Sequence, residues 1–154
     1  MANLLWLQGG ACSGNTMSFL NAEEPSVCDL VTDFGIRVLW HPSLGLALGE
    51  ALQKMLRALV AGEIPLDIFV FEGTVINAPD GSGEWNRFAG RPMKQWVADL
   101  ANVANSRSRL ATAPLGAAFP RQRQIQRKAK ACSFSSANTA AFLERISGLN
   151  QVCR

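Results

Sequence analysis

The sequence contains few of the residues that most often build metal and disulfide sites. Its 154 residues include one histidine and four cysteines. The single histidine, His41, has no partner at metal-ligand spacing, so we assign it no functional role and interpret it as a turn residue with one hydrogen-bonded nitrogen. Four cysteines in a chain without a secretory leader are more natural as free thiols or metal ligands than as a disulfide framework.

Long apolar segments are also absent. No apolar run approaches the roughly 20 residues that a bilayer-spanning helix needs. No secretory or twin-arginine leader precedes the first predicted strand, which begins almost directly after Met1. We therefore expect a cytoplasmic protein without a membrane span.

Acidic residues are nearly absent from the last third of the chain. Residues 1–105 contain six basic and eleven acidic residues, a net charge of −5, whereas residues 106–154 contain nine basic and one acidic, a net charge of +8. The basic run Arg121–Lys130 is not accompanied by aromatic residues, so we expect no nucleic acid partner. We predict one domain at 1–105 and a basic, irregular tail at 106–154.

The first 105 residues alternate between strand and helix patterns. The predicted strands are Leu4–Leu7, Ile36–Trp40 and Leu66–Phe71, and the predicted helices are Met17–Leu20, Pro25–Val31, Leu46–Ala61 and one that begins at Pro92. This order predicts an α/β fold, a three-layer sandwich with a mainly parallel sheet. No strand is predicted after the last helix, so we expect the sheet to be incomplete after about residue 105.

A glycine-rich turn follows the first strand and contains a cysteine. The run Gly9-Gly10-Ala11-Cys12-Ser13-Gly14 lies between a strand and a helix. Ligands bind at the carboxyl ends of strands in open α/β sheets, and glycines let the backbone approach them closely. Cys12 is therefore a candidate ligand, and a buried free thiol is the alternative.

Three motifs together resemble a known family. The run Gly9–Gly14, the later Glu24-Pro25-Ser26-Val27, and Glu72-Gly73 at the end of a strand resemble the N-terminal domain of nickel-iron hydrogenase small subunits. That family is related to the 20 kDa subunit of NADH dehydrogenase, and the resemblance covers about residues 3–105. It implies a flavodoxin-like domain with a 4Fe-4S cluster, proximal to a nickel-iron centre held by a separate large subunit.

The resemblance also implies which residues form the site. Cys12 would be the first cluster ligand, with Gly10 and Gly14 in the turn around the cofactor. Glu72 would lie beside the cluster and the subunit interface, with a helix-free cap or a solvated carboxylate as the alternatives. The family motif is C-x-x-C, and its second cysteine is replaced here by Asn15.

Another residue must then complete the cluster, or the site is incomplete. Cys28 is the nearest substitute ligand and Asp29 a weaker one. A small core residue on a helix is the alternative for Cys28.

A second departure lies after residue 105, where the family's later cluster cysteines and its G-x-C-x-x-x-G-G-I-P pattern are missing. Shifted back by one base, codons for Gly116–Pro120 can encode G-G-I-P. Codons for residues 138–143 can likewise encode H-G-G-F-L-G, which looks like the family's next segment. We therefore hypothesise that residues 106–154 are a frame-shifted translation, in which Cys132 and Cys153 are not ligands.

These observations lead to two expected functions. The first is the electron-transfer small subunit of a nickel-iron hydrogenase, truncated and inactive by itself. Its partner would be the hydrogenase large subunit, and its electron acceptor is not specified by the sequence. The alternative is a flavodoxin-like binding or interaction domain without a cluster.

Overall fold

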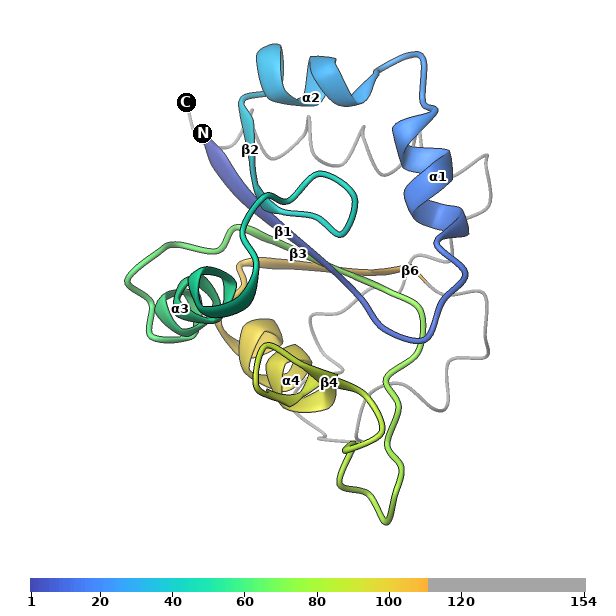
Figure 1. Cartoon of the computed structure of the whole chain (residues 1–154). Helices are drawn as coiled ribbons and strands as arrows, with labels where there is room; N and C mark the ends of the chain where they lie inside the picture. The colour runs from blue at the N-terminus through green and yellow to red at the C-terminus, as the bar shows by residue number, and fades with distance from the viewer. Residues whose placement is uncertain (111–154) are drawn as a thin grey trace.

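A computed structural model describes residues 1–110 and shows a parallel sheet between two layers of helices (Figure 1). The sheet strands are β1 (Ala2–Gln8), β2 (Ile36–Trp40), β3 (Ile68–Glu72) and β6 (Ser106–Leu110). The helices are α1 (Gly14–Leu20), α2 (Val27–Thr32), α3 (Gly49–Val60) and α4 (Met93–Val103). A short antiparallel pair, β4 (Arg87–Phe88) and β5 (Arg91–Pro92), precedes α4.

The strand order is β2-β1-β3-β6, and all the pairings in this sheet are parallel. Helices α1 and α2 lie on one face of the sheet, and α3 and α4 lie on the other (Figure 1). The predicted three-layer α/β fold is therefore confirmed. Strand β2 lies on one side of β1 and β3 on the other, and the connections to them cover opposite faces of the sheet. The carboxyl ends of β1 and β3 therefore form the topological switch point where ligands bind in such folds.

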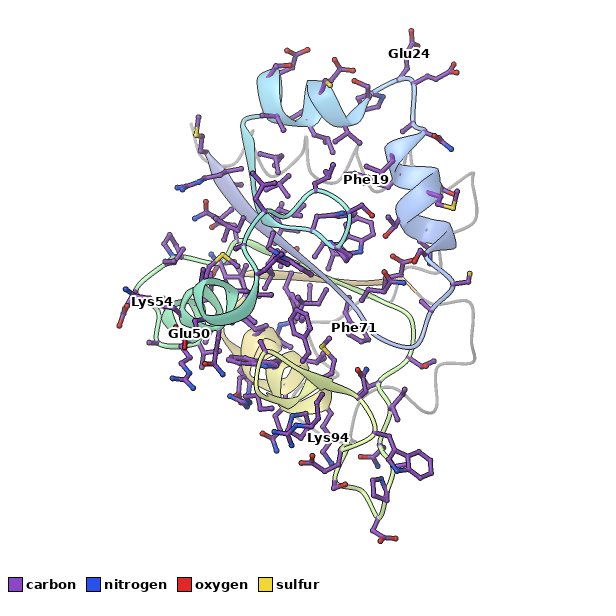
Figure 2. All side chains as sticks on the ribbon, in the orientation of Figure 1. Phe19, Glu24, Glu50, Lys54, Phe71 and Lys94 are labelled. Atoms are coloured by element: carbon purple, nitrogen blue, oxygen red, sulfur yellow. The ribbon has the colours of Figure 1, made fainter. Side chains whose placement is uncertain are left out.

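Each face of the sheet has its own core. Phe71 packs into the core beneath α3 and α4, whereas Phe19 packs into the core beneath α1 and α2 (Figure 2). The five residues of β3 are all buried, as are the five central residues of β1. Burial on both faces explains why these strands show no alternation of polar and apolar residues.

The helix ends follow local sequence signals. Ser26 and Asp29 form a reciprocal capping box at the start of α2, with Asp29 Oδ2 accepting from the Ser26 amide at 2.7 Å. The same hydrogen bonds from Ser26 hold the pKa of the Asp29 carboxyl below its usual value. Gly62, directly after the last turn of α3, has φ of 78°, the left-handed conformation in which glycine ends helices.

The predicted absence of a strand after the last helix is wrong. Ser106–Leu110 forms β6 and pairs in parallel with β3 along five residues. Asp67 helps to place this strand, because its carboxylate accepts from the Asn3 amide at 2.8 Å and from Asn105 Nδ2 at 3.1 Å. Strand pairing uses backbone groups, so the polar residues of this segment do not prevent it from joining the sheet.

Other predictions fall outside residues 1–110. They concern the basic run 121–130, Cys132 and Cys153, and the segments 116–120 and 138–143. Among the helices within residues 1–110, none has the length and apolar character needed to cross a membrane.

The core beneath α3 and α4 gives a direct test of the fold. Leu56 is fully buried on α3, whereas Leu46, just before that helix, is 96% exposed. We expect Leu56→Ala to lower the free energy of unfolding by about 2–5 kcal/mol, through lost burial and a cavity. The matched change Leu46→Ala should alter it by no more than about 0.5 kcal/mol. Urea unfolding measures both, and equal effects would contradict this packing.

Candidate functional site

The turn after β1 lies against the turn after β3. The Gly10 amide donates to the Thr74 carbonyl at 2.9 Å, and the Thr74 amide donates to the Gly10 carbonyl at 3.1 Å. The Gly9 amide donates to the backbone carbonyl of Glu72 at 2.9 Å. These bonds join the carboxyl ends of the two central strands. A ligand bound at the turn after β1 would therefore also lie next to the turn after β3.

Glycine is required where these turns meet. A Cβ on Gly9 would lie 2.5 Å from the Thr74 carbonyl oxygen, and one on Gly10 would lie 2.7 Å from Thr74 Oγ1. Gly73 has φ of 93°, and a Cβ there would lie 2.6 Å from the Gly10 carbonyl oxygen. The glycines recognised in the sequence therefore serve first to bring two backbones together.

The side chain of Glu72 crosses from the end of β3 to the start of α1. Its Oε1 accepts from the backbone amides of Asn15 at 3.1 Å and Thr16 at 3.3 Å. Its Oε2 accepts a short hydrogen bond from the Thr16 hydroxyl. Glu72 is fully buried, so the alternative of a solvated carboxylate is excluded. It supplies the acceptor that the first amides of a helix need.

Ser13 occupies the N-cap position of α1 without capping the helix through its side chain. Its backbone has φ of 64°, a left-handed conformation, and its hydroxyl accepts from Gln8 Nε2 at 2.6 Å. Gln8 Nε2 also contacts the Ala11 carbonyl at 3.4 Å. Hydrogen bonds from Gln8 to Ser13 and from the Asn15 amide to Glu72 therefore restrain the turn.

Cys12 lies on the exposed side of this turn. A Cβ on Gly14 would lie 3.3 Å from Cys12 Sγ, so a larger residue at Gly14 would crowd the thiol. The alternative of a buried thiol is excluded, because Cys12 is exposed. The structure thus brings together four of the predicted site residues, which are Gly10, Cys12, Gly14 and Glu72.

The fifth predicted residue, Cys28, is not brought to the turn. It is the second residue of α2 and is exposed. Figure 1 shows α2 following the end of α1 that is farther from the turn, and Glu24 marks the connecting loop in Figure 2. Asp29, the weaker substitute, is held in the capping box of α2. In the described part of the chain, no three histidine, cysteine or acidic residues gather where they could hold a metal ion.

A buried polar residue next to the site was not recognised from the sequence. His41 follows β2, and its Nδ1 accepts from the Ser43 amide at 3.0 Å, as expected for a turn residue with one bonded nitrogen. It is nevertheless fully buried and lies 4.9 Å from the Trp6 ring and 5.9 Å from the Phe19 ring, between centroids. Burial lowers the pKa of His41, while the charge of Glu72 acts in the opposite direction.

Comparison with solved structures identifies the same fold in chains of hydrogenases. An actinobacterial-type NiFe-hydrogenase chain from Ralstonia eutropha H16 matches with a TM-score of 0.66 and 19% identity, over 96% of this chain and 54% of that one. A Ni-Fe-Se hydrogenase chain from Desulfomicrobium baculatum matches with a TM-score of 0.63 and 19% identity, over 86% of this chain and 55% of that one. At these identities the likeness establishes the fold alone.

Sequence relatives provide independent evidence. A cytochrome c3 hydrogenase small chain from Acidithiobacillus ferrooxidans is 87% identical over 38 residues, which are 25% of this chain and 95% of that relative. The F420 non-reducing hydrogenase II small subunit of Methanosarcina mazei is 27% identical over 113 residues. That match covers 67% of this chain but only 29% of the relative, so the chain spans less than a third of that protein's length.

A family comparison matches most of the domain described above, from Cys12 in the turn onward. The family described as NADH ubiquinone oxidoreductase, 20 Kd subunit, matches residues 12–107, a range that starts at Cys12 and ends within β6. The match covers more than half of the chain. The chain therefore belongs to this family, in which it corresponds to the N-terminal part of a nickel-iron hydrogenase small subunit.

Proposed function

We propose that this chain is the electron-transfer small subunit of a nickel-iron hydrogenase and that Cys12 is a ligand of its proximal 4Fe-4S cluster. The observation that carries the proposal is the exposed Cys12 in a glycine turn at the switch point of the sheet. The family match that starts at Cys12 supports it. The partner would be the hydrogenase large subunit, which would hold the nickel-iron centre, and the location would be cytoplasmic.

The described residues supply one ligand to such a cluster, and not a complete set. Clusters of this kind are held mainly by four cysteine thiolates. Within residues 1–110, the turn contributes Cys12, and Cys28 lies on α2. Asn15 stands at the second position of the family's C-x-x-C motif, and its backbone amide donates to Glu72. Together with the frame-shift hypothesis, under which Cys132 and Cys153 are not ligands, this leads us to propose that the chain by itself is truncated and inactive in hydrogen oxidation.

When bound, a 4Fe-4S cluster would supply one-electron redox chemistry at this turn. The part played by the chain's own residues is to orient the thiol. Glu72 holds the first amides of α1, and Gln8 holds Ser13, so the backbone on both sides of Cys12 is restrained. The alternative function is a flavodoxin-like binding or interaction domain without a cluster.

We also propose that the basic tail results from a frame shift. The structure extends the sheet to Leu110, five residues past the predicted boundary at 105, so a shift would lie close to the end of β6. Sequencing the coding DNA tests this proposal. An intact reading frame through this region, with the same frame in related genes, would overturn it.

The cluster proposal predicts different effects for the two exposed cysteines. After anaerobic reconstitution of the full chain with iron and sulfide, we expect bound iron and acid-labile sulfide in equal amounts, at less than one full cluster per chain. Cys12→Ser should abolish this binding, because it removes the thiolate at the turn. Cys28→Ser should leave it unchanged, because Cys28 lies on α2, which follows the end of α1 farther from the turn.

Iron and sulfide analysis and visible absorption measure this binding. A folded chain that binds no iron would support the alternative function. Unchanged iron in Cys12→Ser would refute the ligand assignment.

A second prediction tests the role of Glu72 as an internal cap. Glu72→Leu leaves the Asn15 and Thr16 amides without their buried acceptor, so we expect the free energy of unfolding to fall by about 1–3 kcal/mol. Glu72→Gln keeps an acceptor oxygen and should cost less. Urea unfolding of both variants provides the comparison, and a larger loss in Glu72→Gln than in Glu72→Leu would contradict the capping role.

A further inference from the structure

A bend in strand β2 places His41 on the same face of the sheet as Glu72. Leu4 pairs with Val38, but the next residue, Leu5, pairs with Trp40, so β2 contains one extra residue at this point. Such a bulge reverses which side chains point to which face. Trp40 accordingly packs beneath α3 and α4, while the His41 ring contacts the Trp6 ring at a tilt of 60° beneath α1 and α2.

The hydrogen bond to Ser43 determines which nitrogen of His41 carries the proton. The Ser43 amide donates to Nδ1, so Nδ1 is the acceptor of a neutral ring and Nε2 carries the hydrogen. Burial lowers the pKa of His41, which keeps the ring neutral near neutral pH. The Nε2–H group is therefore a buried donor, and it has no hydrogen-bond partner among the residues that the structure describes.

Trp6 presents a second donor of the same kind. Its Nε1–H is buried, and within residues 1–110 it also has no hydrogen-bond partner. The Trp6 and His41 rings lie 4.9 Å apart between centroids. Buried donors of this kind are almost always satisfied, by protein or by ordered water. Both donors therefore need an acceptor that residues 1–110 do not supply.

The carboxylate of Glu72 has one lone-pair position that is not yet used by a hydrogen-bond donor. A carboxylate offers about four lone-pair positions. Three are filled, since Oε1 accepts from two amides and Oε2 accepts from the Thr16 hydroxyl. On β3, Glu72 lies two residues beyond Val70, the partner of Trp6, so its side chain is on the same face of the sheet as Trp6. No direct hydrogen bond joins the carboxylate to either ring.

We propose that one buried water molecule accepts hydrogen bonds from Trp6 Nε1–H and His41 Nε2–H and donates one to the carboxylate of Glu72. Three polar partners are sufficient to hold an internal water. His41 is then a positioning residue, because it holds Glu72, which in turn holds the start of α1 after Cys12. The proposal does not depend on a cluster, and iron-free protein is sufficient to test it.

The full chain contains one histidine, so its ring signals in nuclear magnetic resonance need no further assignment. We expect the Nε2–H tautomer at neutral pH and a magnetisation transfer from water to the indole proton of Trp6. The Nδ1–H tautomer, or no transfer from water, would overturn the proposal. This measurement uses the unmodified chain, so it decides the matter even if the variants below do not fold.

Two matched variants test the positioning role. Glutamine can place an N–H donor near the position of Nε2, whereas asparagine reaches only the position of Nδ1, and both remove the ring. We expect amide hydrogen exchange at Asn15 and Thr16 to stay close to wild type in His41→Gln and to become about tenfold faster in His41→Asn. Equal exchange in the two variants would refute the role, because a purely structural loss of the ring affects both alike.

The stability of the chain should depend on the protonation of His41. The unfolded chain takes up a proton near pH 6.5, whereas the folded chain, with its lowered pKa, does so only at lower pH. The free energy of unfolding should therefore decrease as pH falls from about 7 to below 6.5. Glu72 is the charged group that acts on His41, and it opposes this trend without reversing it. Urea unfolding across this range should show this pH dependence of the free energy of unfolding in wild type and not in His41→Gln. The same pH dependence in His41→Gln would show that another titratable group causes it.

Discussion

The buried carboxylate of Glu72 connects the parts of this molecule that would otherwise be independent. Glu72 is the last residue of β3, and its carboxylate accepts hydrogen bonds from the amides of Asn15 and Thr16 in the first turn of α1. Both amides follow the turn that presents Cys12. A short helix such as α1 gains little from its own hydrogen bonds, so an acceptor from another strand contributes much of its stability. The position of Cys12 therefore depends on a residue sixty positions later in the chain.

The face of the sheet beneath α1 and α2 changes character along its length. Near the amino ends of the strands it is apolar, with Leu4 and Ile68 in the core. Near the carboxyl ends the same face carries Glu72, His41 and the polar edge of Trp6. Buried polar groups cost free energy unless they are hydrogen-bonded, so this end of the sheet must be closely specified. That requirement explains why the polar residues gather behind the turn that carries the candidate ligand.

The elements of the fold could be predicted because their signals are local. The runs of apolar residues in β1 and β3, the pattern of α3 and the capping box of α2 all appear within a few neighbouring residues. The strand after α4 was missed because Ser106–Leu110 carries no apolar pattern, and its pairing comes from the backbone of β3. The candidate ligand Cys28 was considered because it is near Cys12 in the sequence, although α1 separates the two in the structure.

The sequence by itself determined the α/β class, the turn around Cys12 and the resemblance to nickel-iron hydrogenase small subunits. These features depend on periodicity, on glycine and on a motif, which are all properties of short segments. The tertiary structure alone decided that Glu72 caps α1, that His41 lies buried against Trp6, and that Cys28 lies apart from Cys12. The first two result from pairing between distant segments and from a single bulge in β2, and the third results from the position of α1 between the two cysteines. None of these contacts is encoded in a local pattern.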